Sequence, residues 1–192
     1  MADRCNTIRL YSFQTDVVYQ VLKRDGVCYS KEEYVRKKYK ESAKVFINAY
    51  GWFVKEAQHI VPKPEGAEYP YWAFTDLYNV DQTGDGHVLT LDVPIGEAIL
   101  FDMFDWTKIM QMHYIGENES EEATFSEELK NMGMNEFQIM TSNFYPEQKA
   151  RIQESWKRLF GHQQAIEAGD NIGVHSVQAG LWCIKDEWIV KE

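Results

Sequence analysis

The chain contains few cysteines and no long apolar segment, and both absences restrict the class of protein. Its three cysteines, Cys5, Cys28 and Cys183, are odd in number and form no C-x-x-C pair. Such a set fits neither a disulfide framework nor a zinc-binding pattern, so we expect reduced thiols. Nothing in the 192 residues approaches 18 consecutive apolar positions, and the first residues lack the apolar stretch of a secretion signal. We therefore expect a cytoplasmic protein with no membrane-spanning segment.

Positive charge is also scarce, with 20 basic residues against 30 acidic ones and a formal net charge of −10. Proteins that bind nucleic acid normally present a basic face, because neutralisation of phosphates supplies most of their affinity. The one basic run, residues 36–40, follows Glu32 and Glu33 at the i,i+4 spacing of ion pairs on a solvated helix. The charge therefore does not support a nucleic-acid partner, and it favours a basic protein partner or simple solubility.

Several common catalytic and metal-binding signatures are missing. There is no G-x-S-x-G, no G-x-x-x-x-G-K-[ST] and no G-x-G-x-x-G, and no two histidines stand four apart around a glutamate. The segment Asp81–Gly86, followed by Asp92, has the ligand spacing of a calcium loop, but aromatic and β-branched residues typical of strands flank it. We interpret it as a glycine-rich hairpin loop, with a calcium-bound loop as the alternative, and we expect no metal.

The residues that are present suffice for a packed core. Hydrophobic residues make up 44% of the chain and aromatic residues 14%, which excludes disorder. Alternating patterns predict strands over Ile8–Phe13, Tyr69–Phe74, His87–Val93 and Ala98–Asp102, and a terminal hairpin formed by Ser176–Ile184 and Trp188–Val190.

Capping residues and helical spacing predict the helices. We expect a short helix over Val17–Lys23, ended by Gly26, and a long helical region opened by a capping box at Ser30 and Glu33. The core-facing stripe of that region is Val45, Ala49, Trp52, Phe53 and Ile60.

Three further segments follow from the same signals. Asp102 or Asp105 is expected to cap a helix that runs to His113. Residues 116–161 are predicted to form a helical insertion, with a Thr124–Glu127 capping box and Pro146 near a helix start. Residues 163–173 are predicted to form a loop. Strands and helices in separate blocks predict one α+β domain over residues 1–192, with a small mixed or antiparallel sheet and packed helices.

Two segments carry candidate chemistry. Aromatic crowding over Tyr69–Phe74, with Tyr71 and Trp72 at its centre, suits either the wall of a pocket for a flat ligand or a strand buried on both faces. Asp102 and Asp105 stand three apart at a predicted helix start, which suits N-capping or, alternatively, acid–base catalysis.

Five segments in order resemble an uncharacterised bacterial family, domain of unknown function 3841. The resemblance covers almost the whole chain and implies a bacterial or phage-related intracellular protein with no established activity. The segments are Leu10–Gln14, Glu65–Phe74, Leu91–Pro94, Leu100–Trp106 and Val177–Trp182.

A second resemblance, to DNA-targeting ADP-ribosyltransferases, rests on Leu10–Thr15 with the following short helix and on Val177–Trp182. It implies an ADP-ribosyltransferase-like fold that binds NAD or another nucleotide. The residues that would bind the cofactor are Tyr11, Ser12, Gln14, Tyr71, Trp72 and Gln178.

Two departures from that family affect the proposed chemistry. Its histidine is replaced by Ser12, and its catalytic glutamate falls on Gly180. Asp102, Asp105 or Glu187 would then have to supply the catalytic acid. The alternative function is a non-enzymatic acidic module that occupies a basic partner surface.

Overall fold

The protein is built on a five-stranded antiparallel sheet with the strand order β4-β1-β3-β6-β5. The computed structural model describes residues 6–33, 36 and 43–191. A separate two-stranded sheet pairs β2 with β7. The strands are β1 (Thr7–Gln14), β2 (Val27–Tyr29), β3 (Tyr71–Phe74), β4 (His87–Pro94), β5 (Ala98–Asp102), β6 (Val177–Leu181) and β7 (Cys183–Lys185). Antiparallel strands with helices in blocks confirm the α+β class.

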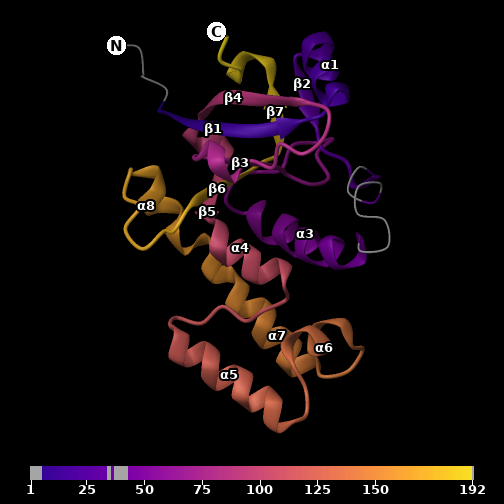
Figure 1. Ribbon diagram of the computed structural model, residues 1–192, viewed down its shortest axis with the longest axis vertical. Coiled ribbons are helices and arrows are strands. Elements are labelled where there is room, and N and C mark those ends of the chain that lie inside the picture. Colours follow the sequence, from indigo (N-terminus) through magenta and orange to yellow (C-terminus); the bar gives the residue numbers. More distant parts are fainter. Residues whose placement is uncertain (1–5, 34–35, 37–42, 192) are drawn as a thin grey trace.

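The helices cover the sheet and extend beyond one end of it. Figure 1 shows α5, α6 and α7 gathered at the end of the molecule remote from β1 and β4. These three helices fill the segment in which the sequence predicts a helical insertion. The helices are α1 (Asp16–Asp25), α3 (Ala43–Ala57), α4 (Met103–Met110), α5 (Glu119–Asn131), α6 (Glu136–Thr141), α7 (Pro146–Ser155) and α8 (Gln163–Glu167), with 3₁₀ turns η2 (Leu77–Asn79), η3 (Ile95–Glu97), η4 (Trp156–His162) and η5 (Asp186–Trp188).

The sheet separates two hydrophobic clusters. On one face, aromatic side chains of α3, α4 and η4 pack together, with Phe53 and Trp106 near its centre. On the other face, aliphatic residues of the sheet pack against α1, α8 and the β2–β7 pair. Because β5 and β6 lie between the two clusters, every one of their residues is buried, as expected for apolar strands without alternation.

Gly180 is required where α3 crosses β6. A Cβ atom at this position would lie 2.8 Å from Cζ of Phe53, which is closer than van der Waals contact allows. Glycine therefore lets the aromatic helix α3 pack directly onto the strand.

Two predicted strand pairings are wrong. The strands over Tyr71–Phe74 and His87–Pro94 do not form a hairpin, because β1 lies between them and pairs with both. The predicted terminal hairpin does not form either, since Cys183–Lys185 leaves the main sheet and pairs with β2. The chain bends at Trp182, whose indole Nε1 donates to the carbonyl of Val61 at 2.7 Å.

Two predicted capping boxes are also wrong. Ser30 is extended and bridges Tyr69, and helical residues begin at Glu32, so Ser30 itself does not cap the helix. Asn118 caps α5, so Thr124 lies inside that helix, where its hydroxyl donates to the carbonyl of Ser120. Ser30 is engaged in a tertiary contact with Tyr69. At α5, the earlier cap Asn118 already accepts from the N–H groups that begin the helix.

Residues 163–173 are only partly a loop, because α8 occupies Gln163–Glu167. The buried amide of Gln163 ties this short helix to β5, through the N–H of Leu100 and the carbonyl of Ala98.

The predicted stripe of the long helix is partly confirmed. Ala49, Trp52 and Phe53 are buried, whereas Ile60 lies after the end of α3 and is partly exposed. The side chain of Val45 and most of residues 34–42 lie outside the described residues. Across the described ranges, no helix is long and apolar enough to cross a membrane.

Candidate functional site

The candidate site lies at the edge of the sheet where β5 ends and β6 begins. Asp102 is the last residue of β5 and the N-cap of α4. Asp102 as a whole is only 2% exposed. Its carboxylate accepts the N–H of Phe104 at 3.0 Å and the N–H of His175 at 3.0 Å. It also accepts Nδ1 of His175 at 2.7 Å and, at 3.4 Å, the N–H of Ser176. Four donors thus converge on one buried carboxylate.

These contacts keep Asp102 ionised. Burial by itself raises the pKa of a carboxyl group, but the bonds from His175 and Phe104 outweigh it and hold the pKa of Asp102 below its ordinary value. An ionised carboxylate only accepts hydrogen bonds, so Nδ1 of His175 carries a proton and donates it to Asp102.

The imidazole of His175 stands at the surface. Its side chain is 68% exposed, whereas that of Asp102 is 3% exposed. The ring lies 4.9 Å from the ring of Phe104, in the first turn of α4. Sequence analysis missed His175, because nothing in a glycine-containing loop indicates that it meets a residue 73 positions away.

Asp105 differs from Asp102 in its environment. It lies in the first turn of α4 and forms no hydrogen bond with any described residue. Burial and the neighbouring charge of Asp102 raise its pKa, although Lys108 and His162 partly oppose the shift. Two carboxyl groups three residues apart therefore have pKa values displaced in opposite directions, as acid–base sites often do.

Asp105→Asn is expected to stabilise the protein at pH 7. Because the folded state raises the pKa of Asp105, ionisation above that pKa costs stability, and the amide avoids this cost. The gain should shrink as the pH falls through the raised pKa towards the unfolded value. Thermal melts from pH 7 to pH 4 measure it.

The matched control is Asp92→Asn, which removes a partner of Arg9 from an exposed pair. We expect a small loss of stability at pH 7 from this change. A Tm of Asp105→Asn below that of the wild type at pH 7 would contradict the argument for Asp105.

The six predicted cofactor residues do not lie together. Directly paired residues share one face of a sheet, and Tyr11 pairs with Phe74, which pairs with Gln178. Trp72, two residues from Phe74, lies on that same face with α3 and α4. Ser12, Gln14 and Tyr71 lie on the opposite face.

The residues on the opposite face have structural partners. Ser12 is buried, donates to the carbonyl of Trp72 at 2.7 Å and accepts Nε2 of Gln14 at 2.8 Å. The hydroxyl of Tyr71 lies 3.1 Å from Sγ of Cys28. Their side chains tie the strands together.

Trp72 is held within the aromatic cluster. Its Nε1 donates to the hydroxyl of Tyr50 at 2.9 Å, and its ring centroid lies 4.7 Å from that of Trp106 and 5.1 Å from that of Phe53. Its ring therefore packs against protein side chains rather than lining a described cavity.

Gln178 is the exception among the six. It is 3% exposed, between Phe74 and Phe101 of the flanking strands, and its amide forms no hydrogen bond with any described residue. Every fully buried side-chain nitrogen and oxygen among the described residues has a partner. The Gln178 amide must therefore reach the surface through a narrow opening.

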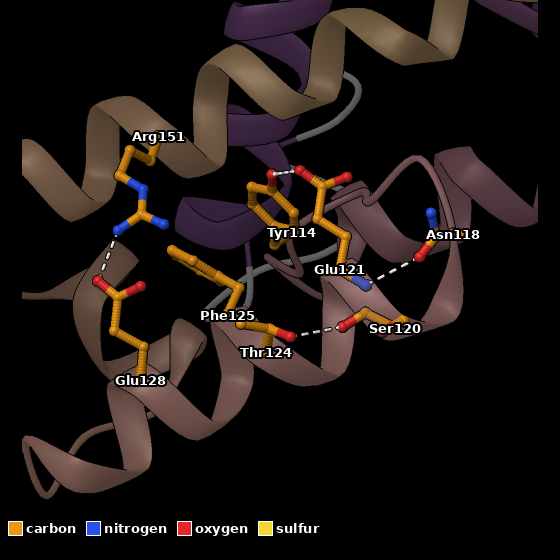
Figure 2. A pocket seen from close by; sticks show the side chains of 8 residues that line it. All are labelled: Tyr114, Asn118, Ser120, Glu121, Thr124, Phe125, Glu128 and Arg151. Atoms are coloured by element: carbon orange, nitrogen blue, oxygen red, sulfur yellow. Dashed lines mark hydrogen bonds and ion pairs between the residues drawn. The ribbon is translucent and has the colours of Figure 1, made fainter.

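Described residues line two grooves that bear on the site. One, of about 360 Å³, lies at the same edge of the sheet and includes Thr75, Asn171 and Val177. The other, of about 320 Å³, lies between α5 and α7 (Figure 2). There Arg151 lies 4.7 Å above the ring of Phe125 and pairs with Glu128 at 2.5 Å.

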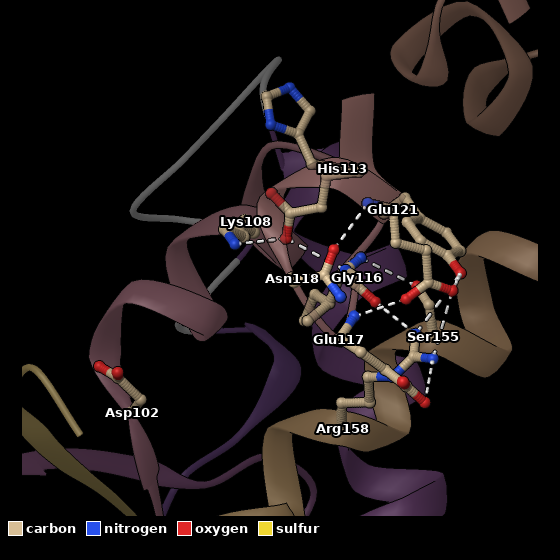
Figure 3. Close-up of polar contacts among 12 residues, drawn as sticks. Asp102, Lys108, His113, Gly116, Glu117, Asn118, Glu121, Ser155 and Arg158 are labelled. Carbon is tan, nitrogen blue, oxygen red and sulfur yellow. Dashed lines mark hydrogen bonds and ion pairs between the residues drawn. The ribbon is translucent and has the colours of Figure 1, made fainter. Parts of the chain in front are cut away.

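The polar network beside α5 serves the packing of the insertion. Lys108 of α4 pairs with Glu122 at 2.6 Å, and Glu122 also accepts the N–H of Gly116. Arg158 donates to the carbonyl of Ile115 at 2.6 Å. Figure 3 shows Asp102 apart from this network.

Neither the thiols nor the carboxylates form a metal site in the described part of the chain. No group of three or more histidine, cysteine, aspartate and glutamate side chains is placed to hold an ion there. Cys28 and Cys183 are free and buried, and burial raises the pKa of Cys183 to about 11. In the segment with the ligand spacing of a calcium loop, Asp81 Oδ1 accepts the N–H and the hydroxyl of Thr83, which closes a turn.

The family model for a domain of unknown function, DUF3841, matches residues 9–190. The chain belongs to this family. No curated protein and no solved structure matches the chain. The DUF3841 match spans the sheet, the insertion and both candidate residues Asp102 and Gln178, so the site lies within the region that defines the family.

Proposed function

We propose that the protein binds a nucleotide, with NAD as the first candidate, beside Gln178 on the α3–α4 face of the sheet. The unpaired amide of Gln178 carries this proposal. The amide has no partner among the described residues and reaches the surface through a narrow opening, where a bound ligand can hydrogen-bond to it. A ligand that pairs with the amide explains why glutamine occupies this position.

The chemistry of an amide restricts the ligand. Its carbonyl accepts and its NH₂ group donates in one plane, which matches the carboxamide of nicotinamide and the N6/N7 edge of adenine. Half-buried Phe74 lies beside Gln178 on the same face, with half-buried Tyr11 on the far side of Phe74, and both aromatic side chains suit a planar ring. The resemblance to DNA-targeting ADP-ribosyltransferases makes NAD the dinucleotide to test first.

The proposed reaction is transfer of the ADP-ribosyl group by attack at the nicotinamide ribose carbon. Gly180 cannot supply the acid that this resemblance implies. Asp102 is committed to four donors, so Asp105, which has no hydrogen bond of its own among the described residues, is the carboxyl group assigned to stabilise developing positive charge.

An acidic binding module is less well supported. Two carboxylates of α5 that could face a basic partner already have partners in the chain, because Glu122 pairs with Lys108 and Glu128 pairs with Arg151. No specific contact favours that function.

Gln178→Met tests the proposal. Without ligand, the variant should unfold at the same temperature as the wild type or slightly above it, because no hydrogen bond is lost. NAD at a hundred times its dissociation constant should stabilise the wild type by about 2.7 kcal/mol and the variant much less. Thermal-shift titration with NAD and with adenosine nucleotides measures both effects.

Gln163→Met is the matched control. Gln163 is also buried, but its amide bonds to Leu100 and Ala98. This change should lower stability by about 1–3 kcal/mol and leave the NAD-induced shift intact. A wild type that shows no shift at millimolar NAD or adenosine nucleotide would refute nucleotide binding.

A further inference from the structure

The carboxylate–imidazole pair at the sheet edge has more than a structural role. Asp102 caps α4 through the N–H of Phe104 and holds the following loop through the backbone N–H groups of His175 and Ser176. The imidazole adds a contact from a side chain that is two-thirds exposed. Such exposed contacts contribute little to stability, so the fold does not require histidine here.

The pair has the geometry of a base held by a carboxylate. The buried oxygen of Asp102 fixes Nδ1 of His175 at 2.7 Å and so sets the tautomer. Nε2 is left with a lone pair and has no partner among the described residues. An imidazole held in this tautomer presents Nε2 as the atom that accepts a proton.

Apolar side chains gather around this edge. Phe104 is 51% exposed against the imidazole, and Leu77 and Tyr78 of η2 are 44% and 92% exposed. Asn79 of the same turn donates to Ser176 Oγ at 2.7 Å, which places η2 beside the His175 loop. Exposed apolar side chains beside a polar reactive group are typical of a ligand-binding surface.

We propose that His175 is the general base of a reaction at this edge, with Asp102 as its positioning residue. The substrate class rests on the proposed function and is a dinucleotide with an N-glycosidic bond, of the NAD type. His175 lies three residues before Gln178 on the same chain segment. Its ring lies against the first turn of α4, the helix that packs on the face of Gln178.

The step balances with water as nucleophile. Nε2 of His175 takes a proton from water while the water oxygen bonds to the anomeric carbon of the nicotinamide ribose. The carbon–nitrogen bond breaks, and nicotinamide leaves as a neutral base with the electron pair. The imidazolium then releases its proton to solvent. A hydroxyl acceptor in place of water yields the ADP-ribosylated acceptor.

Release of nicotinamide from NAD by the full chain tests the base. We expect His175→Gln to bind NAD within twofold of the wild type and to release nicotinamide at least about 100-fold more slowly. Added imidazole should restore part of the rate to His175→Ala.

His87→Gln is the matched control. His87 is 44% exposed and its Nε2 lies 2.6 Å from Asp16, but that carboxylate is itself 69% exposed. Its rate should equal that of the wild type. In Asp102→Asn, kcat should fall, KM should stay unchanged and added imidazole should not restore the rate. If Asp102 only held the loop in place, the substitution would raise KM as well.

Two results would overturn the proposal for a wild type that binds NAD. One is no release of nicotinamide, with water or with added hydroxyl acceptors. The other is an unchanged rate in His175→Gln.

Failure to bind NAD would refute the proposed function separately, and His175 would then be tested with 4-nitrophenyl acetate, which needs no nucleotide site. Hydrolysis lost in His175→Gln but kept in His87→Gln supports the base. Equal rates in the wild type and His175→Gln overturn it.

Discussion

Gly180→Glu is expected to unfold the protein rather than to equip it with a catalytic acid. The proposed likeness to ADP-ribosyltransferases would put a glutamate at this position, but a Cβ atom here would lie 2.8 Å from Cζ and 3.1 Å from Cε1 of Phe53. The carboxylate would also enter the aromatic cluster around Phe53 and Trp72, where no cation among the described residues is placed to pair with it. Overpacking costs about 1–3 kcal/mol, and a buried unpaired charge adds several more.

The combined cost of overpacking and of the buried charge approaches the free energy of unfolding of an ordinary domain, about 5–15 kcal/mol. Circular dichroism and chemical denaturation measure the loss. A folded Gly180→Glu protein with a Tm near that of the wild type would contradict the packing argument.

A smaller change separates the two causes. Gly180→Ala adds only the Cβ atom and should cost about 1–3 kcal/mol. Adding Phe53→Leu removes the ring atoms that the Cβ meets, so the double variant should lose less than the sum of the two single changes. Strict additivity would show that Phe53 is not the neighbour responsible.

Asp102→Ala is expected to cost about 3 kcal/mol at neutral pH. The change removes the acceptor of three backbone N–H groups at once, and an unsatisfied donor costs about 1–3 kcal/mol when it is buried. Urea denaturation measures the difference, and a loss of less than about 1 kcal/mol would show that water replaces the carboxylate at these donors. The matched control is Asp92→Ala, because the Arg9–Asp92 pair is 50% and 41% exposed and its loss should lower stability far less than the loss of Asp102.

The contribution of Asp102 should depend on pH in one direction. Its folded pKa is lowered, so its stabilising effect is complete above the unfolded value of about 3.9 and is lost as the pH falls through the folded value. The difference between wild type and Asp102→Ala should therefore be constant from pH 7 to about pH 5 and shrink below pH 4. A difference that grows on acidification would contradict this.

Local signals were enough for much of the secondary structure. Alternation located β1, and Gly26 ends α1 in the left-handed conformation (φ 75°) that glycine favours. Asp102 caps α4 and Pro146 begins α7, as their residue types indicate. Each of these features depends on residues within one turn or one strand, and such signals can be read without knowing the rest of the chain.

Strand pairing and the site were decided by tertiary structure. The insertion of β1 between β3 and β4, and the pairing of β7 with β2, join segments that no local pattern relates. The sequence by itself determined an acidic α+β chain of the DUF3841 family and placed Asp102 at a helix start. Only the folded chain brought His175 to Asp102 and set Gly180 against Phe53, because these contacts join residues far apart in sequence. Only the folded chain, too, left the Gln178 amide unpaired among the described residues.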